Sequence, residues 1–150
     1  MLRLRVQPLT TDQVITYLKV LASVSAADGR IEDSERSMFE AAMADYGLPD
    51  KARALVRQCL ETPPQIDTEL RRLEDAAVRR LMLRDAFLMA YADGQVSPAE
   101  ADRIERIRMA LRLGEDDARA SEAWVAEGLR WLERGDEMVG TIRSHRRSMF

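Results

Sequence analysis

The sequence contains the pattern Ala-Asp-Gly-x-(Ile/Val)-x-x-x-Glu twice, at Ala27–Glu35 and again at Ala92–Glu100. The two copies lie 65 residues apart, and the same offset aligns Leu48 with Leu113. A pattern that recurs together with its surroundings indicates an internal duplication. Because solenoids normally need three or more units, two copies favour a single pseudo-symmetric bundle.

Each copy carries helix signals on both sides of its Asp-Gly pair. Thr10 and Gln13 have the spacing of a capping box. Ser97, Pro98 and Glu100 combine a cap, a proline at the first helical position and the acid that completes a second box. Asp-Gly ends a helix because glycine adopts a left-handed backbone without steric cost. Apolar residues at helical spacing then predict helices over about 11–27, 33–46, 50–60, 67–74, 76–92, 98–113 and 115–132.

The fold class follows from periodicity and composition. Alanine, leucine, arginine and glutamate dominate, aromatic residues make up 5% of the chain, and no useful run of strand-like alternation occurs. The sequence therefore predicts an all-α protein, a pseudo-duplicated helical bundle. A chain of 150 residues can bury a core as one domain. We expect that domain to span residues 1–150, with the repeat at about 11–62 and 76–133 and a tail at 134–150.

The spacing inside the repeated pattern matches the second half of an EF-hand calcium loop. Such a loop has an acid at position five, glycine at six, an aliphatic residue at eight and a bidentate glutamate at twelve. Asp28 and Glu35 supply the two acids of the first copy, and Asp93 and Glu100 supply those of the second. These four residues are the candidate ligands for a divalent cation: calcium, magnesium, manganese or zinc.

The first half of each loop argues against an ordinary EF-hand. Positions one and three carry side chains without a carboxylate in both copies: Val24 and Ala26, and Met89 and Tyr91. Each loop then offers about three protein oxygens, short of the roughly 6–8 that calcium takes. Three interpretations stay open: turn and cap chemistry alone, a weak or shared divalent-metal site, and a polar surface that a protein partner recognises.

The segments AADGRIEDSE and YADGQVSPAE, each of which ends one helix and opens another, resemble the TerB-like domain of tellurite-resistance proteins. The resemblance covers roughly Thr11 to Leu132. It implies an all-helical bundle of about seven helices, with paired acids that form a metal-binding or interaction surface. Carried over to this chain, that surface includes Asp28, Glu35, Asp93 and Glu100. The resemblance also implies a link to tellurite resistance or stress response.

Three other residues carry reactive chemistry. Asp85 lies in an apolar helical segment and is expected to pair with Arg80, Arg84 or another arginine rather than to bind a ligand. Cys59 occupies an apolar helical position and is expected in the core. His145, the single histidine, lies in the basic tail and cannot by itself build a histidine-rich metal site.

Two tryptophans lie seven residues apart in the last predicted helix, at Trp124 and Trp131. We expect them to close the core. If both are instead exposed, they mark a face that binds a partner.

Composition and charge exclude several functions. The 23 Lys+Arg and 26 Asp+Glu give a net charge of −3, so no overall field favours nucleic acid. No stretch approaches 18 uninterrupted apolar residues, so membrane insertion is not expected. One cysteine and the lack of a secretory signal favour the cytoplasm. No glycine-rich phosphate loop or nucleophile–base pair is found, so we expect no enzyme.

The sequence thus predicts a non-catalytic cytoplasmic binding or scaffold module. Its two Asp-Gly loops would present an acidic surface to a protein partner, either directly or through a divalent cation. The alternative is a metal-binding stress or tellurite-resistance protein whose ion site is itself the function.

Overall fold

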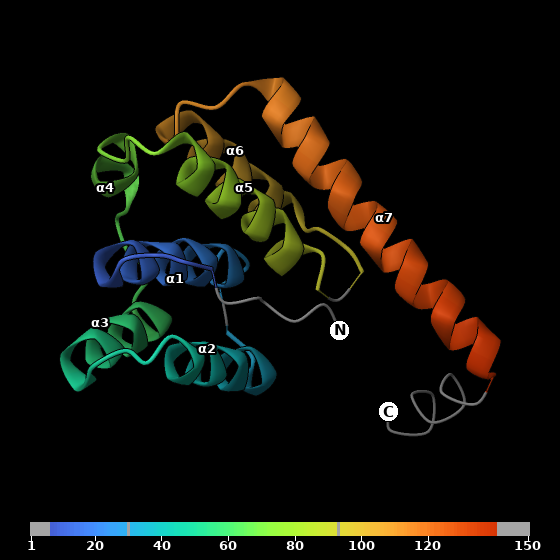
Figure 1. Ribbon diagram of the computed structural model, residues 1–150, viewed down its shortest axis with the longest axis horizontal. Coiled ribbons are helices and arrows are strands. Elements are labelled where there is room, and N and C mark those ends of the chain that lie inside the picture. The colour runs from blue at the N-terminus through green and yellow to red at the C-terminus, as the bar shows by residue number, and fades with distance from the viewer. Residues whose placement is uncertain (1–6, 30, 93, 141–150) are drawn as a thin grey trace.

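The computed structural model describes residues 7–29, 31–92 and 94–140. Within these residues the chain forms seven helices and no strand, which confirms the all-α class. No helix in this part of the chain has the length and apolar character needed to cross a membrane. The helices of Figure 1 are α1 (Thr11–Ser25), α2 (Asp33–Asp45), α3 (Asp50–Glu61), α4 (Asp67–Arg71), α5 (Ala76–Ala90), α6 (Pro98–Ala110) and α7 (Glu115–Val139).

The duplication is visible in the helix boundaries. α1 and α5 each have 15 residues, and α2 and α6 each have 13. Both pairs begin and end at the offset that separates the two Asp-Gly patterns. α3 and α7 also begin at this offset, but α3 has 12 residues and α7 has 25. The repeat therefore accounts for α7 only as far as Ala126, and the helix extends into the segment predicted as a tail.

The helix starts follow the predicted capping chemistry. Thr10 Oγ1 accepts a hydrogen bond from the Gln13 amide at 3.2 Å, and Gln13 Oε1 accepts one from the Thr10 amide at 2.9 Å. Ser97 and Glu100 form the same reciprocal pair at the start of α6, at 3.1 and 2.8 Å. Each cap satisfies an amide that the first helical turn leaves without an intrahelical partner, which is worth about 1 kcal/mol.

α1 lies at the centre of the bundle. It packs against α3, α5 and α6, and α5 packs in turn against α6 and α7. Figure 1 shows α1 between the α2–α3 pair and the α5–α6 pair. Tyr17, Leu18 and Leu21 of α1 are fully buried. Because helices of the second repeat cover this helix of the first, one continuous core joins the two halves.

The expectation that the two tryptophans close the core is wrong. Trp124 is 48% exposed and Trp131 is 66% exposed, whereas Val125 is fully buried. Neighbouring residues of a helix point about 100° apart, because one turn contains 3.6 residues. With Val125 turned toward the bundle, Trp124 and Trp131 lie outside its core. Their joint exposure instead meets the condition for a partner-binding face.

Candidate functional site

The two Asp-Gly loops connect α1 to α2 and α5 to α6, and they have the same backbone structure. Gly29 and Gly94 have φ angles of 100° and 91°, a left-handed region that favours glycine. The Gly29 amide donates to the Ala26 carbonyl at 3.0 Å, and the Gly94 amide donates to the Tyr91 carbonyl at 2.9 Å. In Figure 1 both loops lie toward the right of the view, at the ends of the adjoining helices α1 and α5.

The two glutamates of the motif act as capping partners. Glu35 Oε2 accepts a hydrogen bond from the Glu32 amide at 2.7 Å, and Glu100 Oε2 accepts one from the Ser97 amide at 2.8 Å. Turn and cap chemistry therefore accounts for the glycine and the glutamate of each copy. The acid before each glycine has no part in these contacts: Asp28 is exposed, and Asp93 lies outside the described residues.

Glu35 is partly buried at the start of α2. Burial raises the pKa of its carboxyl group, and the charges of Asp28 and Glu32 act in the same direction. The hydrogen bond from the Glu32 amide opposes this shift. A raised pKa is the opposite of what a nearby metal ion or a strong cationic partner would cause.

The described residues do not form a complete metal site. Among residues 7–29, 31–92 and 94–140, no three histidine, cysteine, aspartate or glutamate side chains are gathered so that they could hold an ion. The positions that carry acids in an EF-hand are taken up by the core, since Val24 is fully buried and Met89 is 6% exposed. Asp28, Glu35 and Glu100 therefore lack the additional oxygen ligands that a protein cage for calcium requires.

A second polar site lies inside the bundle, around Asp85 of α5. The Asp85 side chain is 1% exposed, and both of its oxygens accept hydrogen bonds at 2.7 Å. Tyr17 Oη of α1 donates to Oδ2, and Arg84 Nε donates to Oδ1. The predicted arginine partner is confirmed as Arg84. Burial, together with the Asp85 charge, raises the pKa of Tyr17 and keeps its hydroxyl protonated.

Sequence reasoning missed Tyr17, although a signal was present. Tyr17 lies on the apolar face of α1 that Val14, Leu18 and Leu21 define, and a buried tyrosine normally needs a partner for its hydroxyl. The pair extends to Tyr46, whose ring stands edge-on to that of Tyr17 with centroids 6.2 Å apart.

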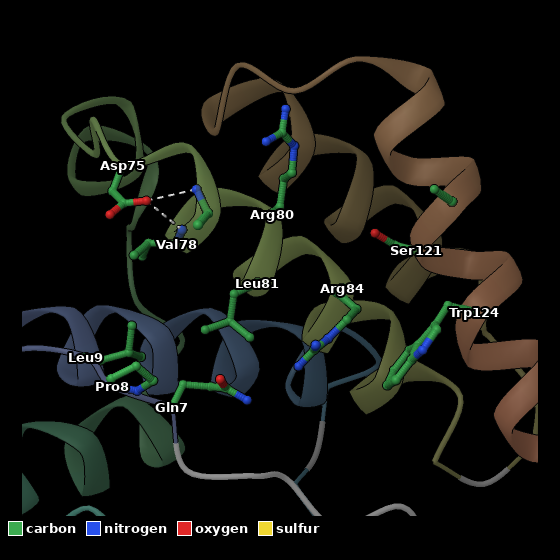
Figure 2. A pocket seen from close by; sticks show the side chains of 12 residues that line it. Gln7, Pro8, Leu9, Asp75, Val78, Arg80, Leu81, Arg84, Ser121 and Trp124 are labelled. Atoms are coloured by element: carbon green, nitrogen blue, oxygen red, sulfur yellow. Dashed lines mark hydrogen bonds between the residues drawn. The ribbon is translucent and has the colours of Figure 1, made fainter.

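A groove opens on the other side of Arg84, between α5, α7 and the segment before α1. We call it the α5–α7 groove; its volume is about 680 Å³. Figure 2 shows Trp124 of α7 reaching toward Arg84 of α5. The Arg84 guanidinium carbon lies 4.9 Å from the centre of a Trp124 ring, a cation–π contact. Leu81 and Leu9 give the groove an apolar lining below this pair.

The remaining candidates are structural or lie outside the description. Cys59 is buried as predicted, and burial raises the pKa of its thiol, which disfavours the reactive thiolate. His145 belongs to residues 141–150, which lie outside the described residues.

The duplicated helical unit, with an Asp-Gly turn after the first helix of each copy, defines an all-α bundle with internal sequence symmetry. The family model described as Tellurite resistance protein TerB matches residues 14–123. The chain therefore belongs to the TerB family, as the resemblance of its two loops predicts. No curated protein and no solved structure matches it.

Proposed function

We propose that this TerB-family chain is a non-catalytic binding module, and that its two Asp-Gly loops recruit a protein partner with a positively charged surface. The observation that carries the proposal is the exposure of Asp28, Glu32 and Asp33 in and beside the first loop. Ser97 and Pro98 occupy the positions of Glu32 and Asp33 in the second loop, where α6 still begins correctly. The fold does not need the extra acids, so their charge is available to a partner.

Binding without catalysis agrees with the chemistry of the described side chains. The thiol of Cys59 is buried, and the carboxylate of Asp85 is fully engaged by Tyr17 and Arg84. Neither group is placed to attack a substrate or to exchange protons with one. The cytoplasm, where thiols stay reduced, is the compartment that we propose. Tellurite resistance or another stress response, as the family description suggests, is the setting that we propose for the recruitment.

Partner capture with matched charge variants tests this function. The full chain is immobilised, and bound proteins are compared with those bound by the double variant Asp28→Asn, Asp33→Asn. A control double variant, Asp12→Asn, Asp67→Asn, removes the same charge from exposed first-turn positions of α1 and α4. We expect one protein to be retained by the parent and the control, and to bind the loop variant about tenfold more weakly.

The same experiment decides whether a cation takes part. Capture is repeated after chelation and after addition of calcium, magnesium, manganese or zinc. Binding that survives chelation supports direct recognition of the acids, and binding that needs one of these ions makes the ion a shared ligand of the complex. Equal capture by the parent and the loop variant contradicts the proposal.

A further inference from the structure

One face of α7 carries alternating large and small side chains. They form two series with a seven-residue spacing, the large Trp124, Trp131 and Met138 and the small Ser121, Gly128 and Gly135. The exposed fraction of the large residues is 48%, 66% and 88% in chain order. A seven-residue repeat is the period with which two long helices pack side by side. We call this face the α7 stripe.

The α7 stripe borders two concave surfaces. Ser121 and Trp124 form one wall of the α5–α7 groove, and Figure 2 shows both on the side of α7 that faces α5. Further along the helix, a second hollow is lined by Trp131, Gly135 and Met138, with Arg134 and Glu137 beside them. The first surface offers a protruding tryptophan, and the second offers the space left by a glycine.

We propose that a second copy of this chain covers the α7 stripe, with its α7 antiparallel to the first about a twofold axis between Leu129 and Arg130. In this register every large residue of one copy lies opposite a small residue of the other: Trp124 opposite Gly135, Trp131 opposite Gly128 and Met138 opposite Ser121. The twofold axis repeats each contact, as a self-complementary interface requires. A parallel pair would place tryptophan against tryptophan.

Charge complementarity supports the same arrangement. Glu127 and Arg134 lie seven residues apart, on the flank of the α7 stripe that points away from Val125. In the antiparallel pair Glu127 of each copy lies opposite Arg134 of the other, whereas a parallel pair brings like residues together. The carboxyl end of α7, which carries a partial negative charge, also approaches the groove wall that contains Arg80 and Arg84.

The length and composition of α7 also call for a partner. Residues beyond Ala126 have no counterpart in α3, so the repeated unit does not need them. Gly128 and Gly135 lie in the interior of this helix, where glycine costs about 1 kcal/mol relative to alanine. A glycine at these positions is useful where the side chain of a second helix packs against the backbone.

Sedimentation of the full chain over a range of concentrations tests the proposal. We expect a monomer–dimer equilibrium in which Trp131→Ala raises the dissociation constant by about thirtyfold. Met109→Ala is the matched control, because Met109 is 65% exposed on α6, away from the α7 stripe. Helix content by circular dichroism should stay unchanged in both variants, since both side chains are exposed.

Charge exchange tests the antiparallel register. Glu127→Arg and Arg134→Glu should each weaken the dimer about fivefold, because each places like charges opposite one another. The double variant should restore the parent affinity. Single substitutions without effect, or a double variant that does not recover, would overturn the register.

Cysteine cross-linking supplies an independent test. Chains with Met138→Cys should not cross-link to one another, because the two positions lie about 25 Å apart along antiparallel helices at 1.5 Å per residue. A mixture of Met138→Cys and Ser121→Cys chains should form the mixed dimer. Self-linking of Met138→Cys would show a parallel pair and overturn the proposal. A chain that stays monomeric at all concentrations would overturn it too, and deletion of residues 1–6 would then test that segment as the occupant of the groove.

Discussion

At the scale of single residues, Asp85 is the position where the two repeats differ most in chemistry. Its counterpart in the first repeat is Val20, which is fully buried. A buried carboxylate without partners is strongly destabilising, so the donors Tyr17 and Arg84 are what make an acid tolerable here. Since Tyr17 belongs to α1 and Asp85 to α5, this hydrogen bond also fixes how the two central helices meet.

Removing the tyrosine hydroxyl should therefore weaken the fold. Tyr17→Phe keeps the ring but leaves Asp85 Oδ2 without its donor, and we expect a loss of about 2 kcal/mol in the free energy of unfolding. Urea denaturation at neutral pH measures it. Tyr91→Phe is the control, because the Tyr91 hydroxyl donates to Glu122 at 2.5 Å on the surface. The control should change stability by less than about 0.5 kcal/mol, and an equal loss in both variants would contradict a special role for the buried pair.

At the scale of helices, the local signals of the sequence predict much of the fold. The Thr10–Gln13 and Ser97–Glu100 boxes lie where their spacing places them, because a cap depends on residues three positions apart. The Tyr17–Asp85 contact joins residues 68 positions apart, and no local spacing encodes it. The exposed tryptophans escaped prediction for a related reason. An apolar helical stripe shows that a face is covered, but the pattern alone does not say by what.

Two glycines of the helical elements should respond to alanine with opposite signs. Gly47 follows α2 with φ 63°, where an L-residue costs about 1–2 kcal/mol, so Gly47→Ala should destabilise the chain by about that amount. Gly135 lies inside α7, and an added Cβ meets nothing within 4 Å. Gly135→Ala should therefore stabilise the dilute monomer by about 0.5–1 kcal/mol. Thermal unfolding at low protein concentration compares the two, and equal signs would contradict these backbone assignments.

At the scale of the whole molecule, the duplication has not produced two independent halves. α1 of the first repeat contacts α5 and α6 of the second, and its buried residues include most of its carboxyl-terminal half. The candidate site depends on the same arrangement, since the two loops leave the ends of α1 and α5. The sequence predicts that the Asp-Gly pattern occurs twice and turns the chain each time. It does not predict which acids remain free, because that depends on the capping contacts of Glu35 and Glu100.

Fragments that separate the repeats should therefore fold only together. Residues 1–66 expose the face of α1 that α5 and α6 cover, and residues 67–150 lack the partner of Asp85. Uncovering even one fully buried leucine costs about 1.5–3 kcal/mol, which is a large part of the stability of a small domain. We expect each fragment alone to show little helical circular dichroism, and an equimolar mixture to recover most of the signal of the intact chain. Cooperative unfolding of the first fragment by itself would show that α2 and α3 suffice to cover α1, and that the core is not shared between the repeats.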